Sequence, residues 1–396
     1  MTLCRDLFVQ ESLVVDVTSA KAPARDRYFD TLRALAIVRV VAYHAFHYAV
    51  LALLFPSMGV MFALAGSLMA RSLDRSAAPT VIRGRVRRLL PALWVMAAVL
   101  VPLMLIAGWG HRPAWPDFLL WVLPLATPPA SHGLGDVGAE GAGVLWYLAT
   151  YLWMVLLSPL LLRLYRRQRL LTIALPLVVL AALHSRHIAD GNNAVQTAGY
   201  VLTFLPCWLL GFAHRDGDLR RMRPVVVAGV AAGCAALGLA WVVDHPGPAG
   251  LDLVPFPLAH ALYSMGFVLA LLRLNPSLAW LGRRPLLQRM VSALNNRAVT
   301  IYLWHNVVIT VAIIVGDRLE LWDVHPGALI YLGFTCIALS LLTVTVLGLG
   351  WVEDLAARRR PRLRPWPIPS PRHSPRHAAG RMADAVEPAP RVGAAA

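Results

Sequence analysis

The sequence contains few charged residues and hardly any lysine. Charged residues make up 15% of its 396 positions, hydrophobic residues make up 58%, and the mean hydropathy is +0.60. Lys21 is the single lysine among 37 basic residues. A water-soluble protein of this length needs much more polar surface than this composition supplies. The scarcity of charge therefore excludes a set of soluble globular domains.

The four cysteines do not form a disulfide framework. Cys4 lies in a polar N-terminal segment, whereas Cys207, Cys234 and Cys336 lie in apolar runs without metal-ligand spacing, so no metal is expected. The first 26 residues lack a continuous apolar core, and we therefore expect no cleavable signal peptide. The net charge of +16 comes from arginines grouped between apolar runs, without the aromatic interleaving of a nucleic-acid-binding surface. We predict no nucleic-acid partner.

Long apolar runs recur along the chain, and each helix that crosses a bilayer needs about 20 mostly apolar residues. Ten runs of this kind lie at about 33–54, 57–73, 89–108, 143–162, 170–184, 196–213, 224–243, 255–272, 298–316 and 327–352. The sequence therefore predicts an all-α, polytopic membrane bundle of about ten transmembrane helices. Segment 118–130 is short and contains three prolines, so we expect an interfacial or re-entrant piece of a loop there.

The arginines predict the orientation of the bundle. With the N-terminus inside, the arginine-rich segments 71–88, 163–169, 214–223 and 273–297 all fall on the cytoplasmic side. The predicted outer loops hold only three arginines, which are Arg112, Arg186 and Arg318. We therefore predict that both termini are cytoplasmic and that the chain lies in the cell membrane (plasma or inner membrane).

The two ends differ from the apolar middle of the chain. Residues 1–26 are expected to form a disordered cytoplasmic tail, and residues 27–355 a transmembrane domain. Residues 356–396 are rich in arginine and proline and cannot bury a core, which predicts a second disordered cytoplasmic tail. No internal repeat is visible, and repeats are common in secondary transporters.

The first apolar run carries four ionisable side chains, which are Arg33, Arg39, His44 and His47. Such groups are costly within a bilayer and are expected to face the bundle interior or a wet cavity. Arg33 and His44 are about 16 Å apart along a helix and point to nearly the same face. The spacing alone does not distinguish functional residues from structural ones. His44 can equally be a structural histidine hydrogen-bonded to a neighbouring helix, and Arg33 can equally anchor the cytoplasmic end of the helix.

Four motifs in order resemble the membrane acyltransferase-3 family over about residues 25–352. They are Arg27-Tyr28-Phe29-Asp30-Thr31-Leu32-Arg33 running on to Tyr43-His44, Arg85-Val86-Arg87-Arg88-Leu89-Leu90-Pro91, Leu145-Trp146-Tyr147-Leu148, and Tyr302-Leu303-Trp304-His305. The chain departs from the family at Ala65, where a serine is usual, and at Val144 and Thr150-Tyr151, where a histidine and a glutamate are often seen.

The resemblance implies transfer of an acyl group, often acetyl, from cytoplasmic acyl-coenzyme A (acyl-CoA) to a hydroxyl of a glycan, lipid or small molecule. It implies His44 as the base or acyl relay and Arg33 as the residue that positions the donor or stabilises charge. Residues expected to bind coenzyme A are Arg85, Arg87 and Arg88. Residues expected to bind substrate are Trp146, Tyr147, Tyr302 and His305. The arginine cluster can equally signal topology and bind lipid phosphates.

Other readings stay open at the level of sequence. The chief alternative is a transporter or exporter of a lipid-linked or hydrophobic metabolite, in which Arg33, Arg39 and His44 would bind substrate or relay protons. A catalytically silent membrane scaffold is a third. Among the remaining histidines, we expect His132 (with Asp136) and the pair His184 and His187 to lie in solvated loops, and His260 to pack in the core or line a cavity. His305 is either an acceptor-binding residue or one that joins helices through Asn306.

Overall fold

The computed structural model describes residues 26–110, 112–183, 192–247, 250–323 and 327–363. Within these ranges the chain is helical and contains no β-strand, apart from an isolated bridge between Gly247 and Gly250. The tails predicted to be disordered lie outside the described residues, except for Asp26 and residues 356–363. The histidine pair His184 and His187 also lies outside them.

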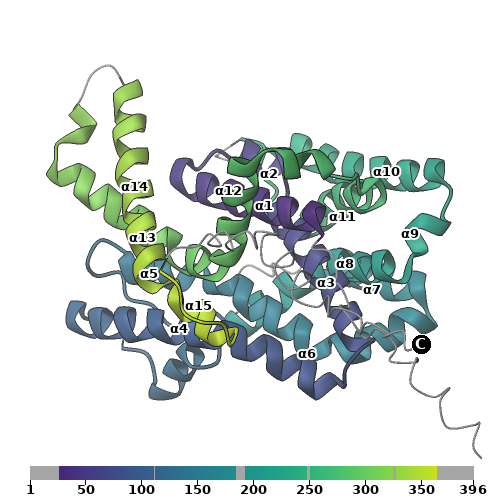
Figure 1. Ribbon diagram of the computed structural model, residues 1–396, viewed down its shortest axis with the longest axis horizontal. Helices are drawn as coiled ribbons and strands as arrows, with labels where there is room; N and C mark the ends of the chain where they lie inside the picture. The colour runs from purple at the N-terminus through teal and green to yellow at the C-terminus, as the bar shows by residue number, and fades with distance from the viewer. Residues whose placement is uncertain (1–25, 111, 184–191, 248–249, 324–326, 364–396) are drawn as a thin grey trace, which may run out of the picture. The chain divides into compact units, whose positions relative to one another are not determined.

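Fifteen α-helices and three 3-10 helices follow one another along the described chain (Figure 1). They are α1 (Arg27–Phe46), α2 (Val50–Leu54), α3 (Ser57–Leu73), α4 (Ala78–Ala107), η1 (Trp115–Trp121), α5 (Val137–Gly143), α6 (Leu145–Arg167), α7 (Arg169–Leu183), α8 (Asn193–Asp216), α9 (Asp218–Arg221), α10 (Pro224–Asp244), α11 (Pro257–Leu274), η4 (Ala279–Arg283), α12 (Pro285–Asn296), α13 (Ala298–Arg318), η5 (Leu321–Asp323), α14 (Ala328–Leu349) and α15 (Trp351–Ala356).

Eight helical stretches in the described ranges are long and apolar enough to cross a membrane. They are Val50–Leu73, Ala78–Ala107, Val137–Arg167, Asn193–Asp216, Pro224–Asp244, Pro257–Leu274, Ala298–Arg318 and Ala328–Ala356. The other two predicted runs correspond to α1, which carries several charges, and to α7, which has only 15 residues. The prediction of an all-α polytopic membrane bundle is confirmed, and each predicted run overlaps at least one helix.

The first apolar run is broken, although the sequence suggested one continuous span. Helix α1 ends at Phe46 because His47 adopts a left-handed backbone conformation, with φ at 53°, and its N–H donates to the carbonyl of Tyr43. Short helix α2 follows and belongs to the same apolar stretch as α3.

Helix α4 also differs from the helix predicted by sequence, because it starts at Ala78 rather than near residue 89, with Pro79 in its first turn. The arginines of segment 83–88 therefore lie on a helix.

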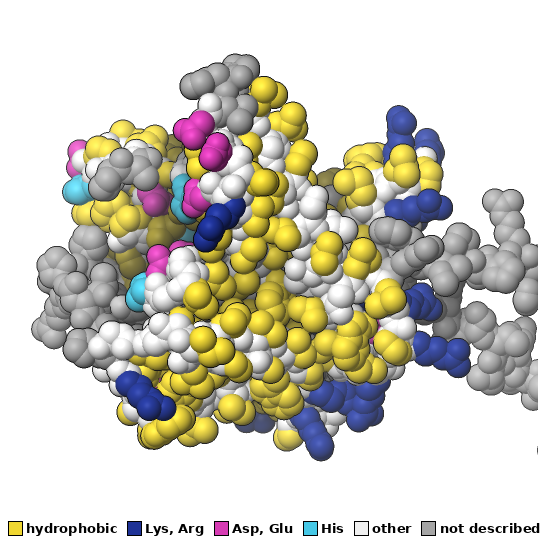
Figure 2. Space-filling view, turned by 90° about the vertical axis from the view of Figure 1, so that its left-hand side faces the viewer, with side chains coloured by type: hydrophobic (Ala, Val, Ile, Leu, Met, Phe, Trp, Pro, Cys, Tyr) yellow, Lys and Arg dark blue, Asp and Glu magenta, His cyan; other side chains and the backbone are white. Residues whose placement is uncertain are grey.

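The surface of the bundle suits a lipid environment. Figure 2 shows a face covered largely by hydrophobic side chains, with most of the visible arginines gathered toward one side and most of the carboxylates and histidines toward the other. Helix α14 buries only one of its side chains, that of Phe334. A soluble helix would bury a whole apolar stripe, so this exposure is expected only where lipid is the solvent.

Glycine allows α3 and α8 to cross at very close range. A Cβ atom on Gly66 would lie 2.3 Å from the carbonyl oxygen of Trp208, and one on Gly211 would lie 2.2 Å from the carbonyl oxygen of Ala63. Membrane helices associate without a hydrophobic driving force, so small residues that bring backbones together supply the packing energy. Helix α3 provides part of the wall of the site described below, and this contact holds it in place.

We predict that Gly66→Ala lowers the thermal unfolding temperature in detergent, because a methyl group forced against backbone costs about 1–3 kcal/mol. Gly84→Ala on α4 is the matched control, since a Cβ there meets nothing within 4 Å. Replacing an unhindered helical glycine is expected to be neutral or slightly stabilising. Equal unfolding temperatures for the two variants would contradict the close crossing of α3 and α8.

A cluster of ion pairs joins α3, α6 and α8 at one end of the bundle. Asp74, which follows α3, accepts hydrogen bonds from Nη2 of Arg166 at 2.8 Å and from Nε of Arg215 at 3.1 Å, and Arg166 also pairs with Asp216 at 2.7 Å. Partial burial tends to raise the pKa of Asp74, but the hydrogen bonds and charges of Arg166 and Arg215 prevail and hold it below the usual 3.8.

A lowered folded-state pKa means that the Asp74 carboxylate stabilises the fold above the unfolded pKa and loses this effect as the pH falls through the folded one. We predict that Asp74→Asn lowers the unfolding temperature at about pH 7, and that the difference from wild type shrinks below about pH 4. The exposed Asp117 of η1 provides the control Asp117→Asn. If the unfolding temperatures of wild type and Asp74→Asn differed by the same amount from neutral to acid pH, the Asp74 charge would contribute nothing to stability.

Candidate active site

Arg33 of α1 is held by a side chain from α12. Its Nη1 donates to Oδ1 of Asn295 at 3.1 Å and lies 3.4 Å from Oδ1 of Asp30. Asn295 is fixed in turn, because its Nδ2 donates to the backbone carbonyls of Asp30 and Val291, each at 2.8 Å. The guanidinium is thus oriented by a neighbouring helix rather than extended into solvent.

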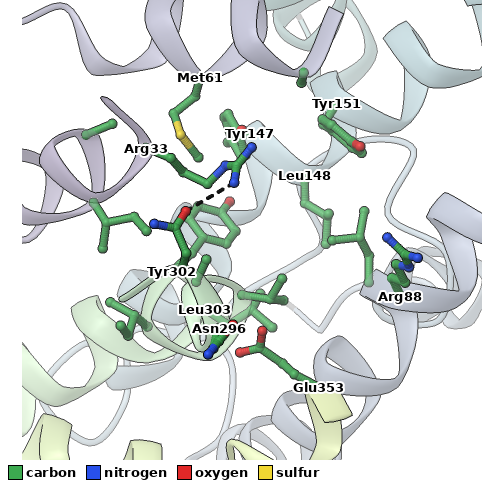
Figure 3. Close-up of a pocket in the computed structure, with 18 of the residues that line it drawn as sticks. Arg33, Met61, Arg88, Tyr147, Leu148, Tyr151, Asn296, Tyr302, Leu303 and Glu353 are labelled. Atoms are coloured by element: carbon green, nitrogen blue, oxygen red, sulfur yellow. Dashed lines mark hydrogen bonds between the residues drawn. The ribbon is translucent and has the colours of Figure 1, made fainter. Parts of the chain in front are cut away.

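Arg33 lines a cavity of about 410 Å³, here called the arginine-lined pocket. Arg85 and Arg88 of α4 and Arg359, which follows α15, also line it. Figure 3 shows Arg33 and Arg88 on opposite sides of the pocket, with Tyr147 and Tyr302 near Arg33 and Glu353 on a further wall. The pocket therefore presents guanidinium groups from three separate parts of the chain.

The carboxylates of this pocket are already engaged by other groups. Oε1 of Glu353 accepts hydrogen bonds from the backbone N–H and the hydroxyl of Thr300, at 2.6 and 2.5 Å. Asp354 forms an ion pair of 2.9 Å with the buried Arg297. Neither carboxylate pairs with an arginine that lines the pocket in the described structure, where Arg33 alone of the four forms an ion pair, with Asp30. The pocket therefore retains a positive character that suits a polyanionic ligand.

A second cavity of about 480 Å³, here called the aromatic pocket, lies beside the first. Its wall includes Trp146, Tyr147, Tyr200 and Phe204, and the rings of Trp146 and Tyr200 lie 4.6 Å apart between centroids. A set of polar side chains also lines it: Arg39, Tyr43, His44, Gln196, Thr203, His260 and His305. Apolar and aromatic walls with a few polar groups are typical of small-molecule sites.

The two pockets meet at a shared wall. Five residues line both cavities: Val40, Met58, Tyr147, Tyr302 and His305. The hydroxyl of Tyr302 donates to the backbone carbonyl of Val144, which ties α13 to the residue before α6. A ligand in the arginine-lined pocket and one in the aromatic pocket therefore approach each other at this wall.

A pair of histidines stands at the junction. The rings of His44 and His305 lie 5.0 Å apart between centroids, nearly edge to face. Nδ1 of His305 lies 2.7 Å from the carbonyl oxygen of Tyr302. A carbonyl only accepts, so this nitrogen carries the proton and Nε2 of the neutral ring holds the lone pair. Nε2 is buried and has no hydrogen-bond partner among the described residues.

The partly buried charge of Arg39 is also explained by the structure. Its Nε donates to the carbonyl of Leu51 at 2.9 Å, and its guanidinium lies 4.9 Å from the centroid of the Tyr43 ring. The carbonyl of Leu51 lies in short helix α2, close to the break in the first apolar run. The same break that shortens α1 thus provides a partner for its partly buried arginine.

Most of the residues proposed from sequence come together around the two pockets. His44, Trp146, Tyr147, Tyr302 and His305 all line the aromatic pocket. Arg33, Arg85 and Arg88 line the other, whereas Arg87 is not among the residues that line it.

The structure also gives the positions of the histidines whose roles the sequence did not decide. His260 lines the aromatic pocket and contacts Phe204, with ring centroids 5.0 Å apart. Nδ1 of His132 lies 2.9 Å from the Asp136 carboxylate on the surface, away from both pockets. Asn306 donates to Glu140 of α5 at 3.0 Å, so it joins helices, while the adjacent His305 lines the pockets. No group of metal-ligating side chains occurs within the described ranges.

Sequence reasoning missed Asn295 and Arg359. Asn295 lies in a segment that was treated as an arginine-rich loop, and Arg359 in a segment assigned to a disordered tail. In the described residues, Asp354 accepts a hydrogen bond from the backbone N–H of Arg362, and Arg297 donates to the carbonyl of Arg362. A signal for Asn295 existed in the amphipathic spacing of 285–296, which places apolar side chains such as Leu286 and Met290 on one helix face.

This fold and site define a polytopic membrane protein with two adjoining cavities. A family model described as an acyltransferase domain matches residues 26–349. The chain therefore belongs to the membrane acyltransferase-3 family. No curated protein and no solved structure matches it. The family resemblance noted from four sequence motifs is confirmed, and the chain is a membrane acyltransferase.

Asn295 is predicted to act as a positioning residue for Arg33. Removal of its side-chain oxygen by Asn295→Ala is expected to lower the rate of acyl transfer about tenfold, because the guanidinium loses an orienting acceptor. Asn295→Asp keeps an acceptor oxygen for Arg33 but loses the Nδ2 donors to the carbonyls of Asp30 and Val291, so its rate should lie between those of Asn295→Ala and wild type. The control is Gln288→Ala, at an exposed position of the same helix. Equal activity of Asn295→Ala and Gln288→Ala would contradict the role of Asn295 in positioning Arg33.

Proposed function

We propose that the protein transfers an acyl group from acyl-CoA to a hydroxyl of a glycan, a lipid or a small molecule. One observation carries the proposal: an arginine-lined pocket and an aromatic pocket meet at a wall that includes His305, with His44 beside it. A group-transfer enzyme needs two substrates whose reacting atoms come within contact distance. Two separate pockets with a common wall meet that requirement.

The arginine-lined pocket is proposed to hold the donor. Coenzyme A carries several phosphate charges, and guanidinium groups bind phosphate oxygens through two parallel N–H donors. Arg33, Arg85, Arg88 and Arg359 supply such donors around one cavity. Acetyl-CoA is the donor that the family resemblance favours. Arg33, which lies on the same helix as Val40 of the shared wall, would position the thioester.

The proposed reaction is attack of the acceptor hydroxyl on the thioester carbonyl. The new bond forms between the acceptor oxygen and the carbonyl carbon, and the bond from that carbon to the sulfur of coenzyme A breaks. His44 takes the proton of the hydroxyl as base and then delivers it to the departing thiolate. In its neutral form, His305 holds its lone pair on Nε2 and provides a second proton acceptor on the same wall.

The aromatic pocket is proposed to hold the acceptor. Its rings provide flat apolar contact, while Gln196, Thr203 and His260 offer hydrogen-bonding groups to a hydroxylated molecule. The positive-inside distribution of arginine would place the arginine-lined pocket toward the cytoplasm, where acyl-CoA is made, and the aromatic pocket in the other half of the membrane. We propose the plasma or inner membrane of the cell as the location.

The proposal predicts that purified protein in nanodiscs moves label from acetyl-CoA to a product when a membrane extract supplies the acceptor. His44→Ala should reduce the rate by about 10²–10⁴-fold, the usual contribution of a general base. Arg33→Ala should also reduce it. The matched control is His132→Ala, because His132 lies on the surface outside both pockets. Product and released coenzyme A are measured together.

The same experiment separates the rival functions. If His44→Ala and His132→Ala keep equal rates, His44 is not the base. If wild type neither binds nor consumes any acyl-CoA, the donor assignment is wrong, and flux of hydrophobic metabolites across vesicles becomes the measurement. A transporter would then show an altered pH profile of flux in His44→Ala, whereas a silent scaffold would show no change.

A further inference from the structure

A third cavity opens from the same junction and is almost entirely apolar. It has a volume of about 230 Å³ and lies between α1, α13 and α14. Phe334, Ala338 and Leu342 of α14 form one wall. The only hydrogen-bonding side chains among its lining residues are those of Thr335 and His305, and Thr335 donates its hydroxyl to the carbonyl of Tyr331 in its own helix. We call this cavity the apolar pocket.

The apolar pocket adjoins the arginine-lined pocket. Four residues line both: Ile37, Val41, Ile301 and His305. With the aromatic pocket, by contrast, it shares His305 alone. All three cavities therefore meet at His305, but the apolar pocket extends the donor side of the site and not the acceptor side.

A ligand that spans these two adjoining pockets must be polar and anionic at one end and apolar at the other. It must also place its reacting atoms near His305, where the acceptor pocket begins. An acyl-CoA with a hydrocarbon chain has this layout, since the phosphates, the thioester and the chain follow one another along the molecule. An acetyl group is too short to occupy the apolar pocket.

We infer that the apolar pocket receives the acyl chain of the donor and that the preferred acyl group is of medium length. This inference rests on the proposed function. A dry cavity of about 150 Å³ in another protein holds the six carbons of benzene, so 230 Å³ accommodates roughly eight to ten carbons. The bond changes are those given above, with octanoyl in place of acetyl.

The energetic consequence is a dependence of the rate on chain length. Each methylene buried in an apolar site improves binding by about fourfold. Octanoyl-CoA has six more methylenes than acetyl-CoA, and the ordering of the chain offsets part of the gain. We expect kcat/KM for octanoyl-CoA to exceed that for acetyl-CoA at least about tenfold.

The test compares acetyl-, butyryl-, octanoyl- and decanoyl-CoA with wild type and three variants in nanodiscs, and measures released coenzyme A with a membrane extract as acceptor. Ala338→Phe fills the pocket and should lower kcat/KM for octanoyl-CoA at least about tenfold while leaving acetyl-CoA unchanged. Leu342→Ala enlarges it and should shift the optimum toward decanoyl-CoA. Cys336→Phe adds bulk at an exposed position on the same helix and should change neither.

Opposite shifts from Ala338→Phe and Leu342→Ala support the inference, because damage to folding would lower the rates with all donors alike. Consumption of acetyl-CoA with no preference for longer chains, and no selective effect of Ala338→Phe, would overturn it and leave the proposed function intact. The inference would also be overturned if the rate depended on the chain length of an added lipid acceptor and not on the chain length of the donor. The apolar pocket would then bind the acceptor. Failure to consume any of the donors would overturn both.

Discussion

The requirement that every buried charge find a partner shapes this protein more than any other constraint. Within a bilayer, no water is available to a stray guanidinium, and an unpaired one costs several kcal/mol. Arg39 is satisfied by a carbonyl exposed where the first apolar run breaks, and Arg33 by an asparagine from α12. Arg297, which is 1% exposed, pairs with Asp354 and draws the following segment back onto the bundle. The partners of these three arginines come from α1, α2, α12 and the region after α14, so satisfying them also fixes the walls of the site.

The same requirement places most of the arginines and most of the histidines of the site around different cavities. The four arginines surround one cavity whose nearby carboxylates are engaged elsewhere, while the histidines line another. The separation is not complete, because His305 lines both cavities and Arg39 lines the aromatic pocket, where its guanidinium contacts Tyr43. A wall formed by α1, α3, α6 and α13 stands between them, and His305 on that wall also faces the apolar pocket. This arrangement suits a donor that is charged at one end and apolar at the other, and an acceptor that arrives from a different direction.

Much of the site could be predicted from sequence because its motifs are local. The spacing of Arg33 and His44 on one helix face, and the Trp146-Tyr147 and Tyr302-to-His305 segments, are visible in short stretches of chain. Arg87 shows the limit of this reasoning, since neighbouring arginines on one helix point in different directions, and only the packing of α4 shows which of them line a cavity. Asn295 could not be found, because its partner Arg33 lies 262 residues away in the chain. Arg359 could not be found either, because only the packing of the residues after α15 brings it to the pocket.

The sequence by itself determined that this chain is an all-α membrane protein, where its apolar helices lie, and to which family it belongs. These follow from composition and from local motifs, since a helix in lipid satisfies its backbone within its own residues. The tertiary structure alone decided where α1 ends, how closely α3 and α8 cross, and that three cavities of different character meet at His305. The reason is physical: a cavity is the space that several helices leave between them, and its shape depends on how side chains distant in sequence pack together.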